Sequence, residues 1–79
     1  MSDPITIVAT VDATDLNCPL PLLKAKQGLK PLATGECLKV IATDPGSQRD
    51  FKVFAELSGN TLVSAGEEGR VFTYIIKKA

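Results

Sequence analysis

One short stretch of this chain combines residue types that could do covalent chemistry: Asn17-Cys18-Pro19-Leu20-Pro21. Proline is well suited to the first position of a helix, because its missing N–H would be unpaired there anyway. A residue before proline is also pushed toward the extended backbone that an N-cap needs. The spacing therefore predicts a helix that begins at Pro19, with Cys18 at its N-cap.

A cysteine in that position would be ionised more readily than an ordinary one. The positive end of the helix dipole favours the thiolate, and thiolate is the form that attacks a persulfide or a disulfide. Pro21 offers no N–H, so the amide of Leu20 is the expected partner of the Cys18 sulfur. Asp12 and Asp15 would oppose ionisation if they lie close. The structural alternative is that Cys18 is a small buried apolar residue.

The composition excludes several other kinds of site. The 79 residues contain no histidine, which removes Cys-His and Ser-His catalysis and most transition-metal sites, and we expect no metal and no cofactor. Nine basic residues balance nine acidic ones, so nothing in the charge favours nucleic acid or an anionic membrane. We see no secretory signal and no apolar run near the ~20 residues of a membrane span, and expect a cytoplasmic protein.

Two further features have a functional and a structural interpretation. Cys37 could be a resolving thiol for Cys18, but a cysteine at the start of a strand more often packs in the interior. Lys24, Lys26 and Lys30 could form a docking patch for an acidic partner. We favour the simpler interpretation, in which they are a solvated helix face.

The first half of the chain predicts the elements that position Cys18. Residues 5–11 are apolar and β-branched, which is typical of a strand, and the polar residues 12–17 form a turn. The helix predicted for residues 19–30 ends before Pro31. Its expected apolar side consists of Leu22, Leu23, Ala25 and Leu29.

A second strand is predicted for residues 37–43, with Leu38, Val40 and Ala42 on one face. A turn at Asp44-Pro45-Gly46 follows it.

The second half of the chain predicts a helix and a hairpin. Ser47 followed by Asp50 resembles a capping box, and Gly59 is a typical helix end, so we expect a helix between Ser47 and Gly59. The alternation of Phe51, Val53, Ala55 and Leu57 would also fit a strand. Length and end signals favour the helix. Residues 61–65 and 71–77 are predicted to form a hairpin around Gly66-Glu67-Glu68-Gly69.

The order strand, helix, strand, helix, strand, strand predicts an α/β (α+β) fold in a single domain spanning residues 1–79. The expected architecture is a two-layer sandwich, βαβαββ. A mixed four-stranded sheet would carry both helices on one face.

From about Asp12 to Lys78, the chain resembles the TusA-type (SirA-like) sulfur carriers. The core of the resemblance is the Cys-Pro-x-Pro motif, here Cys18, Pro19, Leu20 and Pro21. Supporting matches are Asp12, Gly35, Asp44-Pro45, Arg49-Asp50 and the closing Tyr74-Ile75-Ile76-Lys77-Lys78. The resemblance implies the βαβαββ fold.

It also implies that Cys18 accepts sulfane sulfur from a donor, such as a cysteine desulfurase or a rhodanese-like protein. The sulfur then passes to an acceptor protein, toward thiolated tRNA bases, molybdenum cofactor or sulfur oxidation in different members. Whether such a protein counts as a persulfide-forming sulfurtransferase or a stoichiometric carrier stays open. A carrier that presents one sulfur to two partners is expected to be a monomer.

One residue departs from the family pattern. Family members usually have glycine three residues before the cysteine, and this chain has Asp15. Aspartate tolerates the left-handed backbone better than most residues, so we expect the turn to survive. The alternative function is a non-catalytic interaction or regulatory module on the same fold. A nucleic-acid binder is disfavoured by the balanced charge and the lack of a basic aromatic surface.

Overall fold

The computed structural model describes residues 6–17 and 19–79. Their element order is strand, helix, strand, helix, strand, strand, as the sequence predicts. The elements are β1 (Ile7–Ala13), α1 (Leu20–Leu29), β2 (Cys37–Ala42), α2 (Ser47–Ser58), β3 (Thr61–Glu68) and β4 (Val71–Lys77).

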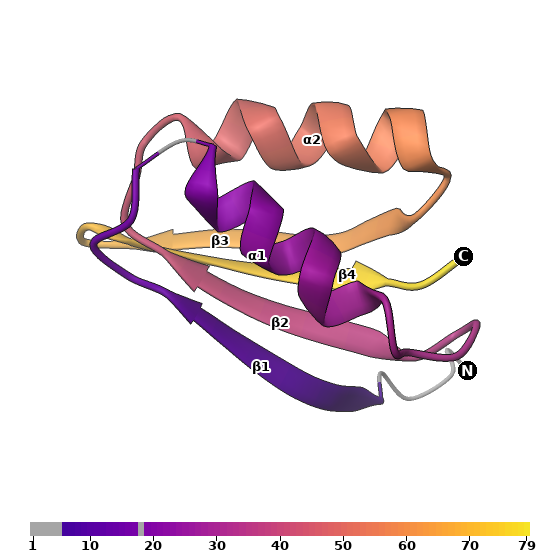
Figure 1. The fold of residues 1–79 in the computed structure, drawn as a ribbon. Helices are drawn as coiled ribbons and strands as arrows, with labels where there is room; N and C mark the ends of the chain where they lie inside the picture. Colours follow the sequence, from indigo (N-terminus) through magenta and orange to yellow (C-terminus); the bar gives the residue numbers. More distant parts are fainter. Residues whose placement is uncertain (1–5, 18) are drawn as a thin grey trace.

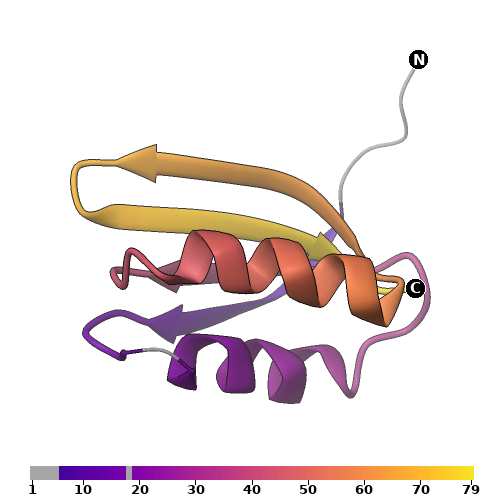
Figure 2. The same cartoon turned by 90° about the horizontal axis from the view of Figure 1, so that it is seen from above.

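The four strands form one mixed sheet in the order β1-β2-β4-β3 (Figure 1). β1 and β2 are parallel and are joined through α1, whereas β4 runs antiparallel to both β2 and β3. Both helices lie on the same face of the sheet, side by side, as the view from above shows (Figure 2). The predicted two-layer sandwich is therefore confirmed.

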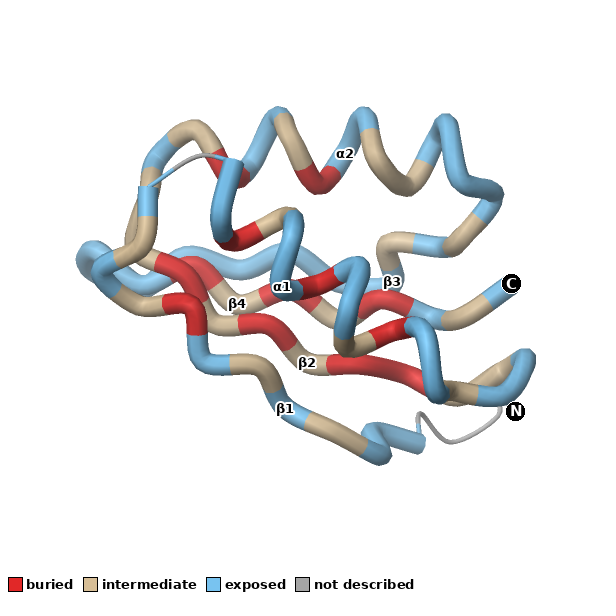
Figure 3. The backbone as a smooth tube through the Cα atoms, viewed as in Figure 1, coloured by how far each residue is buried: buried red, intermediate tan, exposed pale blue. Residues whose placement is uncertain are grey.

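The core lies between the helices and this face of the sheet (Figure 3). Alternate residues of β2 point into it, because side chains along a strand alternate between the two faces. Leu38, Val40 and Ala42 are fully buried, as predicted. The other buried apolar side chains of the cluster are Ala13, Ala25, Leu29, Phe51, Phe72, Tyr74 and Ile76.

The first helix packs closely on the parallel pair of strands because of a glycine. A Cβ built on Gly28 would lie 2.9 Å from Cγ2 of Val11 and 3.0 Å from Cδ2 of Leu38. Ala25 and Leu29 are buried on the same side of α1. Leu23, which the sequence places on the apolar side, is 48% exposed, so that prediction is wrong. The buried side is turned toward Pro21 instead.

The hairpin between β3 and β4 is tighter than predicted. Glu67 pairs with Phe72 and Glu68 with Val71, so both glutamates belong to the strand. The two-residue turn is Gly69-Arg70, and Gly69 has φ 62°. A type II′ turn needs glycine with positive φ at its first central position, and its twist matches that of the strands.

The second helix begins at Ser47 and ends before Gly59, which has φ 80° and donates its N–H to the carbonyl of Ala55. The predicted capping box is wrong, because this helix start has no side-chain cap. Ser47 is buried instead, and its Oγ lies 2.7 Å from the Tyr74 hydroxyl on β4. The Tyr74 ring stacks on Phe51 of α2 with 4.4 Å between centroids.

Among the described residues, neither helix combines the length and the apolar character needed to cross a membrane.

Candidate functional site

The segments around the Cys-Pro-Leu-Pro motif gather at one end of the molecule. β1 and β2 are parallel, so the loops that follow them meet at the same edge of the sheet. Both helices begin at this end, and the β3–β4 turn lies there too (Figures 1 and 2). Cys18, the predicted reactive residue, lies outside the described residues. Its neighbours Asn17 and Pro19 are both exposed.

The start of α1 differs by one residue from the prediction. Leu20, not Pro19, is the first helical residue, and Pro19 occupies the N-cap with φ −97° and ψ 16°. The carbonyl of Pro19 accepts the N–H of Leu23 at 3.0 Å, which is how an N-cap residue opens a helix. Pro21 then falls at the second helical position and is buried.

The N–H of Leu20 has a backbone partner. It donates to the carbonyl of Asn17 at 2.9 Å. The predicted contact of this amide with the Cys18 sulfur involves a residue outside the described part of the chain and stays a prediction. Spacing alone could not reveal this hydrogen bond between residues on either side of the cysteine.

The loop from Thr14 to Asn17 begins with a local turn built on Asp12. Oδ1 of Asp12 accepts the Thr14 hydroxyl at 2.7 Å and the Thr14 N–H at 3.0 Å. An aspartate that bonds the backbone two residues ahead is a common turn device. Leu16 donates its N–H to the carbonyl of Ala13, and its side chain packs against the hydrophobic core. Both contacts hold the loop on the body of the protein.

These hydrogen bonds also fix the charge of Asp12. The Thr14 hydroxyl and then the Thr14 N–H hold the pKa of the Asp12 carboxyl below its ordinary value, and Lys24 on α1 adds to the effect. Partial desolvation opposes them. Asp12 is therefore a carboxylate at neutral pH, and its lone pairs are already directed at Thr14.

Asp15 has the left-handed backbone that the sequence leads us to expect. Its φ is 64°, and it is the non-glycine residue of the described chain with this conformation. Its N–H donates to Oγ1 of Thr43 at 2.9 Å, a bond that spans 28 residues. The loop after β1 is thereby tied to the loop after β2. Sequence reasoning missed Thr43, although parallel strands bring their carboxyl ends together.

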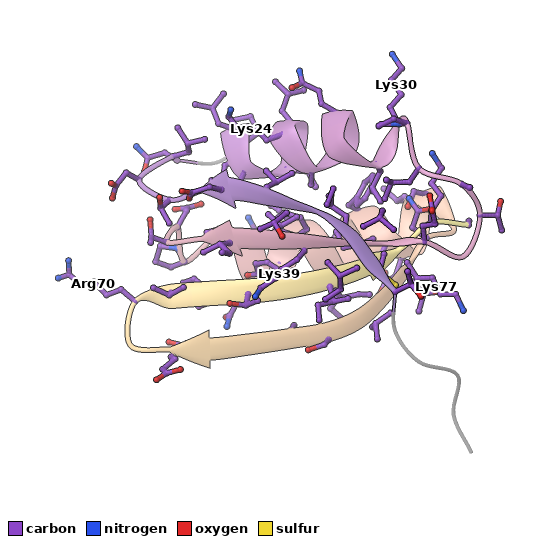
Figure 4. All side chains as sticks on the ribbon, turned by 90° about the horizontal axis from the view of Figure 1, so that it is seen from below. Lys24, Lys30, Lys39, Arg70 and Lys77 are labelled. Atoms are coloured by element: carbon purple, nitrogen blue, oxygen red, sulfur yellow. The ribbon has the colours of Figure 1, made fainter. Side chains whose placement is uncertain are left out.

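A hollow of about 660 Å³ opens beside this tie. Asp15 and Thr43 line one side of it, and Glu67 and Arg70 of the hairpin line another. Figure 4 shows Arg70 reaching outward from the hairpin tip. Acidic and basic groups thus stand at the same end of the fold as the cysteine motif.

A second hollow, of about 510 Å³, lies between the helices. Leu22 and Phe54 form part of its wall, and the ammonium of Lys26 stands 5.7 Å from the centre of the Phe54 ring. Lys24 instead acts on Asp12, and Lys30 stands at the far end of α1 (Figure 4). The three lysines therefore have different surroundings rather than one shared patch.

Cys37 has the surroundings of a packing residue. It is a free cysteine with 2% of its surface exposed. It begins β2, where its N–H donates to the carbonyl of Thr6 and it pairs with Lys77 of β4. The structural interpretation of Cys37 agrees with this burial.

The sequence of the chain is similar to those of known proteins. Residues 9–78 match the family model described as "Sulfurtransferase TusA". The "Sulfur carrier protein TusA" of Allochromatium vinosum is 52% identical over 69 residues, covering 87% of this chain and 91% of that protein. The protein of that name from Pseudomonas putida is 44% identical over 70 residues, covering 89% of this chain and 88% of that protein.

A solved structure has the same fold. The SirA-like protein of Desulfitobacterium hafniense superposes with a TM-score of 0.78 at 25% identity, over 89% of this chain and 96% of that one. Its likeness extends to the whole βαβαββ arrangement that brings the loops after β1 and β2 together. With the family match over residues 9–78, it follows that the chain belongs to the sulfurtransferase TusA family.

Proposed function

We propose that this chain is a sulfur carrier that holds sulfane sulfur as a persulfide on Cys18. The observation that carries the proposal is the 52% identity over 69 residues with a protein named as a sulfur carrier. The surface position of Asn17, Pro19 and Leu20 on both sides of Cys18 supports it. A site that exchanges sulfur with two proteins has to lie where both can reach it.

The chemistry is two transfers of one sulfur atom. The Cys18 thiolate attacks the outer sulfur of a donor persulfide, the donor S–S bond breaks, and the donor thiolate leaves. An acceptor thiolate then attacks the outer sulfur on Cys18 and releases the Cys18 thiolate. The sulfane sulfur keeps its oxidation state, and neither step consumes an external oxidant or reductant.

The donor we propose is a cysteine desulfurase or a rhodanese-like protein, because both form persulfides, and the acceptor is a protein thiol. Contacts with two successive partners are expected to be transient and small. Within this role the chain is a carrier that returns unchanged after each cycle.

The alternative is a non-catalytic interaction or regulatory module on the same fold, motivated by Asp15 in place of the family glycine and by the balanced charge. It predicts that Cys18→Ala leaves partner binding unchanged, whereas a carrier needs the Cys18 thiol. Asp15 keeps the turn, with φ 64° and a hydrogen bond to Thr43.

The proposal is tested by following labelled sulfur. The chain is incubated with a cysteine desulfurase and ³⁵S-cysteine, separated from the enzyme, and treated with or without a thiol reductant. We expect label that the reductant releases, full labelling of Cys37→Ala and none of Cys18→Ser. Equal labelling of Cys18→Ser and the native chain would overturn the proposal.

A further inference from the structure

Thr43 stands in the loop after β2, far in sequence from the cysteine motif, yet it holds the loop that leads to Cys18. Its Oγ1 accepts the N–H of Asp15 at 2.9 Å. The bond joins two loops that belong to different strand–helix connections. Other hydrogen bonds made by the described residues on either side of Cys18 are local: Thr14 to Asp12, Leu16 to Ala13, and Leu20 to Asn17.

The bond acts at Asp15, the non-glycine residue with a positive φ among the described residues of this loop. A left-handed conformation is unfavourable for a non-glycine residue, although aspartate tolerates it better than most. Asp15 adopts φ 64°. A hydrogen bond made by its own N–H opposes relaxation of that residue. If Asp15 relaxed to negative φ, the chain direction would change at this point, three residues before Cys18.

We infer that Thr43 is a positioning residue for Cys18: its hydroxyl holds Asp15 in the left-handed conformation and so sets the direction of the chain that enters the cysteine motif. The inference rests on the proposed function for its importance, because a carrier must present its sulfur to two partners in one orientation. The geometry itself does not depend on which reaction Cys18 performs.

Loss of the hydroxyl should change the reactivity of the cysteine more than the stability of the fold. The bond lies in an exposed loop, whereas the core is formed by other residues. A displacement of about 1 Å at a reacting group can cost ~100-fold in rate. Reactivity is therefore the sensitive measurement, and thermal unfolding is the control for general damage.

The experiment compares Thr43→Val, which removes the acceptor at nearly constant volume, with Thr43→Ser, which keeps it. Thr61→Val is the matched control, because it makes the same change at an exposed position at the start of β3. Alkylation of Cys18 by iodoacetamide is followed on its peptide from about pH 5 to 10, without any sulfur donor. Melting temperature is measured on every variant.

We expect Thr43→Val to alkylate about threefold to tenfold more slowly at pH 7, with its pH profile displaced to higher pH. Cys18 directly precedes the N-cap residue Pro19 in sequence, and a thiolate that moves away from a helix N-terminus is stabilised less. Thr43→Ser and Thr61→Val should follow the native profile. A native profile in folded Thr43→Val would overturn the inference, as would an equal displacement in Thr61→Val. Because no sulfur donor is used, these outcomes are independent of whether Cys18 carries sulfur.

Discussion

At the residue scale, the two cysteines differ in their surroundings, and this should separate their reactivity. Cys37 is 2% exposed, whereas the described neighbours of Cys18 are exposed. A buried cysteine in apolar surroundings is inert toward alkylation. We predict that iodoacetamide modifies Cys18 at least about 100-fold faster than Cys37 in the native chain, as read by peptide mass. In denaturant the two rates should converge, and comparable native rates would contradict the assignment of Cys37 to the interior.

Tyr74 is the chain's one tyrosine, so its ionisation can be observed directly. Burial raises the pKa of its hydroxyl above the ordinary 10.0, although the Ser47 hydrogen bond lowers it, and Asp44, Glu67 and Asp50 add to the increase. The folded state thus holds this proton more tightly than the unfolded state. The resulting stability is complete below about pH 10 and is lost as pH rises through the folded pKa.

We therefore predict that urea unfolding at about pH 11 shows a lower free energy of unfolding than at about pH 9, and that Tyr74→Phe reduces this pH dependence. Tyrosinate absorbance of the native chain should rise at higher pH than that of the chain in denaturant. Coincident titrations of the two states would show that the hydroxyl is not buried as described.

Some of the site's residues could be predicted from the sequence and others could not. The left-handed backbone of Asp15 follows from the residue type and the turn. The acceptor on Thr43 does not, because it lies 28 residues away and depends on which strands pair in parallel. The sequence spacing also did not predict that the Leu20 N–H would donate to the carbonyl of Asn17.

At the scale of elements, α2 is fixed to β4 by one buried polar pair within apolar packing. Ser47 is 1% and Tyr74 is 1% exposed, and their hydroxyls are 2.7 Å apart. Removal of either hydroxyl leaves the other buried without its partner, which costs about 1–3 kcal/mol. Removal of both leaves neither unsatisfied.

A double-mutant cycle should show this coupling. We predict that Ser47→Ala and Tyr74→Phe each lower the free energy of unfolding by about 1–2 kcal/mol, and that the double variant loses less than the sum. Chemical denaturation of the four proteins measures it. Strict additivity would mean that the two hydroxyls do not depend on each other.

The element boundaries were predictable where hydrophobic periodicity is strong and not where polar residues decide. The faces of β2 follow from alternation, and Gly59 marks the end of α2. Ser47 is a residue type that often caps helices, but its hydroxyl is hydrogen-bonded to the hydroxyl of Tyr74, a buried residue of β4. Gly66-Glu67-Glu68-Gly69 resembles a loop, yet cross-strand pairing extends β3 to Glu68.

At the scale of the whole molecule, the face of the sheet away from the helices bears on self-association. Lys39 and Lys77 stand on this face, which Figure 4 shows from below. Stacking two copies face to face would bury these charges, and an unpaired buried charge is costly. We predict that light scattering at micromolar concentration gives the mass of one chain, 8.4 kDa. A mass of two chains would contradict this.

The order of elements could be predicted from the sequence, and with it the two-layer architecture, because two helices and four short strands have few ways to share one core. The position of each strand in the sheet could not. β4 lies between β2 and β3, and this order decides that the hairpin tip comes beside the loop of Asp15. The hollow at that end is therefore a product of tertiary structure.

The proposed role of Cys18 as a sulfur carrier is tested most directly by the intact mass of the chain after exposure to a cysteine desulfurase and free cysteine. We predict a gain of one sulfur atom that a reductant reverses, that Cys37→Ala retains and that Cys18→Ser lacks. The absence of any gain with several persulfide donors, on folded protein with a free Cys18 thiol, would contradict it.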